Sequence, residues 1–128
     1  MDEMFMKPGA VSWTELATDD TEAAKQFYGK LFGWTFQTME MPGMNYDVIS
    51  VEGRQFGGVL KMPQDKAEMP PLWISYVTVE NVDEIAKQAV ALGAKLIRPP
   101  QDIPEVGRFC ILQDPQGAGI AAITYLKR

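Results

Sequence analysis

The first regular pattern in the chain is an alternation of two kinds of residue. From Ala10 to Ala17 the sequence reads AVSWTELA, in which Trp13 and Glu15 share one face and Leu16 lies on the other. Strict alternation over this length is typical of a β-strand with two different faces. We therefore predict a strand over Ala10–Ala17.

A helical pattern follows this strand. Asp19 is predicted as the N-cap, with Glu22 three residues later as the reciprocal partner of a capping box. Gly33 is a typical residue to end the helix, which is predicted over about Asp20–Phe32. The apolar residues at helical spacing are Ala24, Phe27, Tyr28 and Leu31.

Three more alternating segments follow the predicted helix. They are predicted as strands over Trp34–Gln37, Tyr46–Val51 and Gln55–Leu60. A Pro-Gly pair separates the first two, and Glu52–Arg54 is predicted as a hairpin turn. The next segment, Met62–Pro71, holds three prolines without apolar periodicity and is predicted as a linker.

Beyond the linker the same order of patterns recurs. A strand is predicted over Trp73–Val79, and Asn81 with Glu84 forms a second capping box. The apolar stripe of this helix runs from Val82 to Leu92 and stops at Gly93. Three strands complete the chain, over Lys95–Arg98, Arg108–Gln113 and Gly119–Tyr125.

The two halves superpose as an internal repeat. Leu16 corresponds to Val77, and Leu31 corresponds to Leu92 at the same offset along the chain. The predicted fold is α+β: one domain over 1–128, built from two tandem βαβββ modules at 9–61 and 72–126 with 62–71 between them. We expect a curved mixed sheet around a central cleft, with the helices on its convex side, and the cleft is the predicted binding site.

Composition limits the chemistry that such a cleft can perform. The chain has 128 residues and no histidine, which excludes histidine-ligated metal sites and histidine-dependent triads or dyads. Its single cysteine, Cys110, can form neither an intrachain disulfide nor a cysteine-only zinc site. Cys110 lies in the apolar run FCIL, and we interpret it as an inert buried thiol rather than a nucleophile.

Charge and hydropathy narrow the range of partners. Twelve basic and 17 acidic residues give a net charge of −5, and the pI is near 4.7. The only basic pair is the terminal Lys127-Arg128, so nucleic acid is not an expected partner. No apolar stretch is long enough to span a bilayer, so we expect a cytoplasmic protein with no membrane partner.

Three segments carry a family resemblance. They are LATDDTEAAKQFYGKLFGW from Leu16 to Trp34, VTVENVDEIAKQAVALGAKL from Val77 to Leu96, and GRFCILQDPQGAGIAAI from Gly107 to Ile123. Together they resemble the vicinal oxygen chelate superfamily, in which Asp114-Pro115-Gln116-Gly117 matches a DPxG turn. That superfamily includes glyoxalase I, extradiol dioxygenases, methylmalonyl-CoA epimerase and bleomycin-binding resistance proteins, so membership alone does not fix an activity.

The resemblance also implies where metal ligands would lie. Metal-using members place a histidine on the first strand of each module and a glutamate on the last. Here those positions fall on Trp13, on Ile74 or Ser75, around Leu60, and on Ala121. These side chains bind divalent ions poorly, so the resemblance implies a member without metal, and no cofactor is expected.

Glu15 is the most informative single residue, because it shares the predicted cleft face with Trp13. Burying a carboxylate is costly unless it is paired. One interpretation is that Glu15 orients a ligand or acts as a general base. The alternative is a structural ion pair with an interior arginine such as Arg108 or Arg54.

Aromatic side chains are the other candidates for the cleft. The predicted ligand-binding set is Trp13, Glu15, Tyr46, Ile74, Tyr76, Arg108 and Ala121. Arg108 is expected to bind an anionic group, with partnership to Glu15 or Asp114 as the alternative. Trp73 is predicted to serve packing or an interface, and Tyr28 to be structural.

We favour a protein that binds a small organic ligand, cationic or aromatic, in a metal-free cleft. The first alternative is a lyase, oxygenase or isomerase that uses Glu15, with or without an oxygen-ligated ion such as Mg²⁺ or Mn²⁺. The second is a regulatory or interaction module with a vestigial cleft. The resemblance also implies a homodimer.

Overall fold

The computed structural model describes residues 3–62 and 71–126 and divides into two compact units. The α1 unit comprises Trp13–Ile74, and the α2 unit comprises Met1–Ser12 together with Ser75–Arg128. Each unit holds one predicted helix and its associated strands. In the described part of the chain, neither α-helix is long and apolar enough to cross a membrane.

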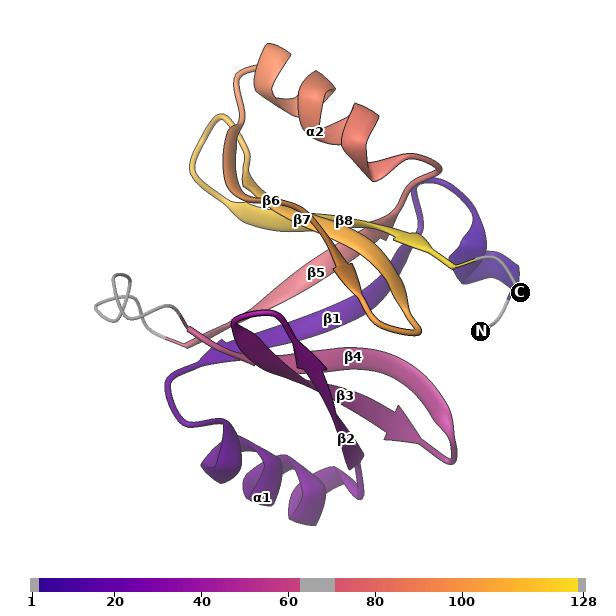
Figure 1. The fold of residues 1–128 in the computed structure, drawn as a ribbon, viewed down its shortest axis with the longest axis vertical. Coiled ribbons are helices and arrows are strands. Elements are labelled where there is room, and N and C mark those ends of the chain that lie inside the picture. The colour runs from indigo at the N-terminus through magenta and orange to yellow at the C-terminus, as the bar shows by residue number, and fades with distance from the viewer. Residues whose placement is uncertain (1–2, 63–70, 127–128) are drawn as a thin grey trace. The chain divides into compact units, whose positions relative to one another are not determined.

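The α1 unit contains one helix and a four-stranded mixed sheet (Figure 1). The strand order is β2-β3-β4-β1, in which β1 pairs with β4 in parallel and the other neighbours are antiparallel. Its elements are β1 (Val11–Thr18), α1 (Thr21–Phe32), β2 (Thr35–Met41), β3 (Met44–Val51) and β4 (Arg54–Lys61).

The ends of α1 are fixed by its capping residues. Gly33 ends the helix with a left-handed backbone, φ 74°, as predicted. The prediction for the other end was wrong by one residue: Asp20, not Asp19, accepts a hydrogen bond from the Ala23 N–H at 3.0 Å. Glu22 forms an ion pair with Lys25 at 2.8 Å.

One face of the α1 unit's sheet lies under α1. Its buried cluster is formed by Leu16, Ile49 and Val59, against which Tyr28 of the helix packs. Asp47 is buried on this face and accepts hydrogen bonds from Thr38 at 2.6 Å and from Lys25 at 3.3 Å. The predicted placement of Leu16 beneath the helix is confirmed.

The α2 unit repeats this arrangement, with strand order β5-β8-β7-β6 (Figure 1). Here β5 pairs with β8 in parallel, and the remaining neighbours are antiparallel. The elements are β5 (Leu72–Thr78), α2 (Val82–Ala91), β6 (Lys95–Ile103), β7 (Gly107–Gln113) and β8 (Gly119–Tyr125). The second predicted cap is confirmed, because Asn81 accepts a hydrogen bond from the Glu84 N–H at 3.2 Å.

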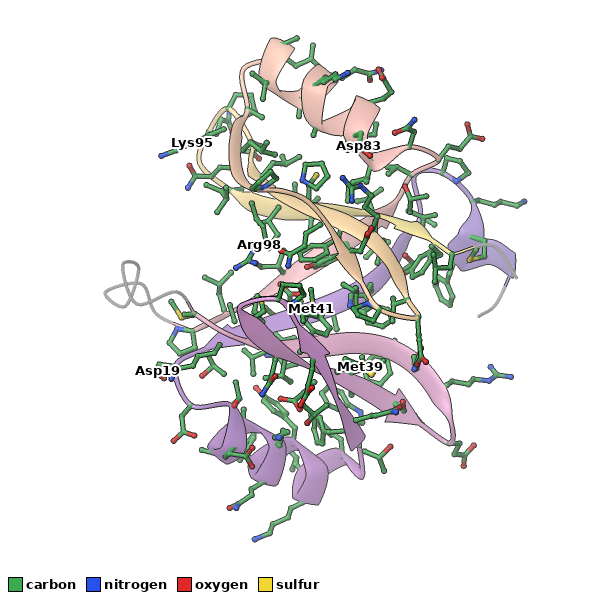
Figure 2. The ribbon with its side chains drawn as sticks, in the orientation of Figure 1. Asp19, Met39, Met41, Asp83, Lys95 and Arg98 are labelled. Atoms are coloured by element: carbon green, nitrogen blue, oxygen red, sulfur yellow. The ribbon has the colours of Figure 1, made fainter. Side chains whose placement is uncertain are left out.

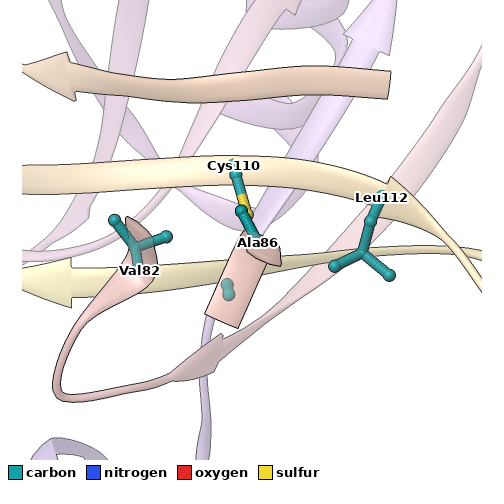
Figure 3. Packing of buried hydrophobic residues seen from close by; sticks show 5 residues of the cluster. Val82, Ala86, Cys110 and Leu112 are labelled. Carbon is teal, nitrogen blue, oxygen red and sulfur yellow. The ribbon is translucent and has the colours of Figure 1, made fainter. Parts of the chain in front are cut away.

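Beneath α2 lies a core of small and medium apolar side chains, shown in Figure 3. Val82 and Ala86 of the helix pack with Cys110 and Leu112 of β7 and with Ala122 of β8. Cys110 is fully buried, and burial raises the pKa of its thiol. The interpretation of Cys110 as an inert thiol is therefore supported, because a raised pKa leaves little reactive thiolate near neutral pH.

The N-terminal segment is bound to the α2 unit. It begins with the 3₁₀-helix η1 (Glu3–Met6). The Gly9 N–H donates to the Thr78 carbonyl and the Thr78 N–H donates to the Ala10 carbonyl, both at 2.8 Å. The hydroxyls of Ser12 and Tyr125 are 2.7 Å apart, and the Thr78 hydroxyl lies 2.6 Å from that of Ser12. These contacts explain why residues 9–12 group with the second half of the chain.

The α+β class and the two βαβββ modules are confirmed. The two compact units divide within β1 and β5, and the module bounds 9–61 and 72–126 stay a prediction. Most of the predicted linker 62–71 lies outside the described residues. The central cleft between the modules stays a prediction.

Replacing Tyr125 by Phe is expected to change stability mainly at alkaline pH. Burial raises the pKa of Tyr125 from 10.0 to about 12. A pKa raised by folding contributes stability that is complete below the unfolded value and is lost as pH rises through the folded value. Tyr125→Phe should therefore make the loss of unfolding free energy between about pH 10 and pH 12 shallower.

At neutral pH the same substitution should cost about 1 kcal/mol through the lost hydrogen bond with Ser12. Urea unfolding at a series of pH values measures both effects. An alkaline profile that runs parallel to that of the wild type would contradict the assignment of this titration to Tyr125.

Candidate functional site

The face of the α1 unit's sheet that α1 does not cover carries a carboxylate and two large aromatic side chains. In each unit, we call the face of the sheet that the unit's own helix does not cover the helix-free face. Trp13 and Glu15 project from β1 and Tyr46 from β3, and they are 2%, 0% and 0% exposed. The prediction that Trp13 and Glu15 lie opposite Leu16 is confirmed by this arrangement.

The geometry around Tyr46 depends on a glycine. The Trp13 indole Nε1–H donates a hydrogen bond to the Tyr46 hydroxyl at 3.0 Å. A Cβ added at Gly58 would overlap the Tyr46 phenol ring, so the ring lies across the backbone of β4 at this residue. Gly58 is the register partner of Glu15 on β1, which places the Tyr46 ring beside the strand position of Glu15.

Methionines extend this face along β2. Met39 is the register partner of Tyr46, and paired residues of neighbouring strands point to the same side of a sheet. Met41 is 6% exposed and pairs with Met44 at the end of the hairpin. Figure 2 shows Met39 and Met41 on β2. Both lie beyond the predicted strand Trp34–Gln37 and are absent from the predicted binding set.

The helix-free face of the α2 unit holds a second row of candidates. Four residues are register partners across neighbouring strands, so their side chains point to the same side of the sheet. They are Tyr76 on β5, Ala121 on β8, Ile111 on β7 and Arg98 on β6. Tyr76 is fully buried and its ring lies 5.9 Å from that of Phe109. The structure therefore brings together the predicted residues Tyr76 and Ala121. Ile74, which belongs to the α1 unit, is two residues before Tyr76 on β5 and is also buried.

Arg98 is a candidate that the sequence analysis missed. The residue is half-buried, and its Nη1 donates to the Gln101 Oε1 at 3.1 Å. The register shifts between Leu96 and Arg98, so Leu96 packs toward α2 while Arg98 is placed on the opposite face (Figure 2). Simple alternation would place Leu96 and Arg98 on the same face of β6. The signal in the sequence for the register shift is the Pro99-Pro100 pair.

The predicted orientation of Arg108 is wrong. It lies on the same face as Cys110, beneath α2, where its guanidinium forms a two-point contact with Asp83 at 3.0 and 3.2 Å. A third bond joins Arg108 to Asp102 at 3.1 Å. The contact with Arg108 lowers the pKa of Asp83.

Neither alternative partner suggested for Arg108 is found in these contacts. Asp114 accepts hydrogen bonds from the Gln116 and Ala118 N–H groups at 2.9 and 3.0 Å, which close the turn before β8. These bonds lower the pKa of Asp114.

The structural predictions for Tyr28 and Trp73 are confirmed. The Trp73 Nε1–H donates to the Tyr28 hydroxyl at 3.2 Å, and the two rings meet edge to face with centroids 5.3 Å apart. Both residues lie on the helix side of the α1 unit, where Tyr28 packs against the core. They belong to packing and not to the helix-free face.

The donor groups on the helix-free faces do not fit a transition-metal centre. The sequence has no histidine, and the described residues contain no group of three or more His, Cys, Asp or Glu side chains that could hold an ion. The four positions that the resemblance assigns to ligands carry Trp13, Ile74 or Ser75, Leu60 and Ala121. An indole and aliphatic side chains supply no donor of the kind that such ions require, and the neutral hydroxyl of Ser75 is a weak ligand.

Comparison with known proteins places the chain in a family. The model of the Glyoxalase/Bleomycin resistance protein/Dioxygenase superfamily matches residues 10–121. A Mycobacterium bovis protein named "Putative glyoxylase CFP32" is 34% identical over 117 residues, which are 89% of this chain and 45% of that protein. The anthracycline biosynthesis protein DnrV of Streptomyces peucetius is 30% identical over 127 residues, covering 89% and 46%. The chain thus spans about half the length of these relatives.

Solved structures of low sequence identity share the fold. A methylmalonyl-CoA epimerase from Mycobacterium tuberculosis superposes with a TM-score of 0.68 at 13% identity, covering 99% of this chain and 93% of that one. A Streptomyces coelicolor methylmalonyl-CoA epimerase variant, solved with 2-nitronate-propionyl-CoA, gives 0.70 at 15% identity, with 94% and 100% covered.

Gly58→Ala is expected to destabilise the protein by about 1–3 kcal/mol, because the new methyl group would force the Tyr46 ring away from its position. The matched control is Gly119→Ala, also in a strand, where an added Cβ has no neighbour within 4 Å. Urea unfolding compares the two variants. Equal losses would show that the Tyr46 ring does not depend on the space at Gly58.

Proposed function

Because the chain belongs to the glyoxalase, bleomycin resistance and dioxygenase superfamily, we propose that it binds a small organic molecule on its helix-free faces, without a metal ion. The observation that carries this proposal is the grouping of Trp13, Glu15 and Tyr46 on the helix-free face of the α1 unit. The proposal includes a cytoplasmic location.

The chemistry of this face favours a cationic or aromatic ligand. Aromatic rings offer flat apolar walls, and a cation over such a ring gains about 0.5–2 kcal/mol. Glu15 adds a carboxylate, and a carboxylate attracts a cation more strongly in a buried setting than in water. The hydrogen bond between Trp13 and Tyr46 holds both rings in a fixed orientation, which lowers the entropy lost when a ligand binds.

On the α2 unit, Tyr76 and Arg98 supply the corresponding groups. Tyr76 offers a buried ring, and Arg98 carries a planar guanidinium suited to a carboxylate or phosphate. The face of the α2 unit, taken by itself, would therefore suit a ligand with an acidic group. We therefore replace Arg108 by Arg98 in the proposed binding set.

Turnover at Glu15 is a second candidate function, supported by the names of the relatives. One carries the name "Putative glyoxylase CFP32", and several of the structural neighbours are methylmalonyl-CoA epimerases. Epimerisation moves a proton on a carbon beside a carbonyl group, which requires a base in contact with that carbon. Glu15, on the helix-free face of the α1 unit, would remove this proton, and inversion requires a second group to deliver a proton to the opposite side of the carbon.

A fluorescence titration tests ligand binding. The probe is a panel of small aromatic cations, each paired with a neutral molecule of the same shape. We expect the cations to raise the melting temperature and to change tryptophan emission, because a molecule bound only by the native state stabilises it. The emission change should be absent from Trp13→Phe and retained in Trp73→Phe. A panel in which no molecule changes either signal would favour a vestigial binding face.

Glu15→Gln separates recognition from structure. It should weaken cation binding by about tenfold or more while leaving binding of the neutral partners unchanged, because only the charge is removed. Unfolding free energy is measured alongside. A loss of several kcal/mol in stability with unchanged binding would show that Glu15 is a structural ion-pair partner.

An isotope assay distinguishes binding from turnover. Methylmalonyl-CoA is incubated with the protein in deuterated water, and incorporation at the carbon between its two carbonyl groups is followed by mass spectrometry. The binding proposal predicts incorporation no faster than in buffer. Incorporation that is catalysed by the wild type and lost in Glu15→Gln would establish an enzyme instead.

A further inference from the structure

Three methionines lie together at one end of the helix-free face of the α1 unit. Met39 and Met41 are two residues apart on β2, so their side chains point to the same side of the sheet; both are labelled in Figure 2. Met39 pairs with Tyr46, and Met41 pairs with Met44 on β3. We call Met39, Met41 and Met44 the methionine pad, and in the register of the strands it begins directly beside Tyr46.

The covered face of the same sheet has a different composition. Beneath α1, the strands β2, β3 and β4 contribute Phe36, Ile49 and Val59 to the core. Aromatic and β-branched side chains of this kind are the ones that strands favour, and methionine is not among them. Strand formation alone therefore does not explain why three paired positions on the helix-free side carry methionine.

The methionine pad is more accessible to solvent than the residues it adjoins. Trp13, Glu15 and Tyr46 are at most 2% exposed. Met39 and Met44, in contrast, are only partly buried. A molecule that approaches this face from solvent therefore has direct access to thioether side chains next to Tyr46.

The pad and the aromatic pair differ in how freely they can move. The Trp13 indole and the Tyr46 hydroxyl are joined by a hydrogen bond of 3.0 Å, which fixes the orientation of both rings. A methionine side chain is unbranched and has three rotatable bonds, so it can fill spaces of different shape, and its sulfur makes favourable contacts with aromatic rings. The face thus combines a fixed part with an adaptable part.

We propose that the methionine pad determines specificity, by receiving the apolar or aromatic body of the ligand and adapting to bodies of different outline. This inference rests on the proposed function, in which Glu15 and the two rings bind a cationic group. Proteins that bind several partners at one site use flexible methionine-rich surfaces that repack around each of them. The pad therefore predicts narrow selection of the cationic group and broad selection of the body attached to it.

Methyl NMR of protein with ¹³C-labelled methionine methyl groups tests whether the pad contacts the ligand. The probes are the trimethylammonium derivatives of benzene, naphthalene and biphenyl, which share one cationic group and differ in the body. The naphthalene and biphenyl derivatives should displace the signals of Met39 and Met44, together with the indole N–H signal of Trp13. Met6, 42% exposed in η1 of the other unit, is the internal control and should not respond.

The pattern of responses separates this inference from the proposed function. A shift of the Trp13 indole signal with all pad methyl signals unmoved would overturn the role of the pad and leave the proposed binding face standing. If neither the indole nor the pad responds to any of the three cations, the proposed function and this inference both fail.

A stiffened pad tests the adaptability directly. The variant that combines Met39→Ile, Met41→Ile and Met44→Ile keeps the pad apolar and suits a strand, but isoleucine is branched at Cβ and rigid at χ1. It should weaken binding of the naphthalene and biphenyl derivatives by about two- to tenfold, and of the benzene derivative by less than about twofold.

The matched control for the stiffened pad is Met6→Ile, which should bind all three cations as the wild type does. Urea unfolding of each variant verifies that the fold is retained. Equal affinities of the stiffened variant and the wild type for all three cations would overturn the proposal, and so would an equal loss for all three.

Discussion

Each unit has a sheet with two faces and a helix that covers only one of them. On the covered face, apolar side chains such as Leu16 or Cys110 pack under the helix. On the helix-free face, Trp13, Tyr46 and Tyr76 are also buried. The need to bury both faces determines most other features of the chain, because every inner strand must carry residues that tolerate burial on either side.

Among the buried residues of the helix-free face, Glu15 is the one whose burial costs the most free energy. A carboxylate that is 0% exposed costs free energy that an aliphatic residue at the same place would not. Trp13 and Tyr46 on the same face each carry a polar atom. The Tyr46 ring fits only because residue 58 is a glycine and has no Cβ. A face built only for stability would be better served by aliphatic packing. This is the physical reason for treating the helix-free face as a place of recognition.

The outer surface of α1 differs from both faces of the sheet, because its side chains are not buried. Its aromatic side chains stabilise the α1 unit through ring contacts, but the exposed ones contribute little to that unit's own core.

Sequence pattern predicted the elements well, because alternation and helical spacing were clear in both halves. It placed Trp13 and Glu15 opposite Leu16 correctly, since β1 alternates regularly at these residues. It failed where the register shifts, because one irregularity in β6 moves Arg98 to the face opposite Leu96. The prediction for Arg108 was wrong for another reason. Arg108 shares a face of β7 with Cys110, and that face lies under α2 and not on the helix-free side.

Other features depend on contacts between distant segments and have no local signature. The space that Gly58 leaves for Tyr46 and the bonds of the N-terminal segment to Thr78 are of this kind. The N-cap is Asp20 and not Asp19. Sequence pattern locates the start of a helix only to within one or two residues, so it does not distinguish these neighbours.

The most direct measurement of the central claim is chemical-shift mapping by NMR with an aromatic cation from the screening panel. Binding at the helix-free face predicts that the largest changes fall on Trp13, Glu15 and Tyr46 and on the indole N–H of Trp13. The exposed residues of α1 and α2 should change little. Changes centred on the helices, with the Trp13 indole unaffected, would contradict the proposed site.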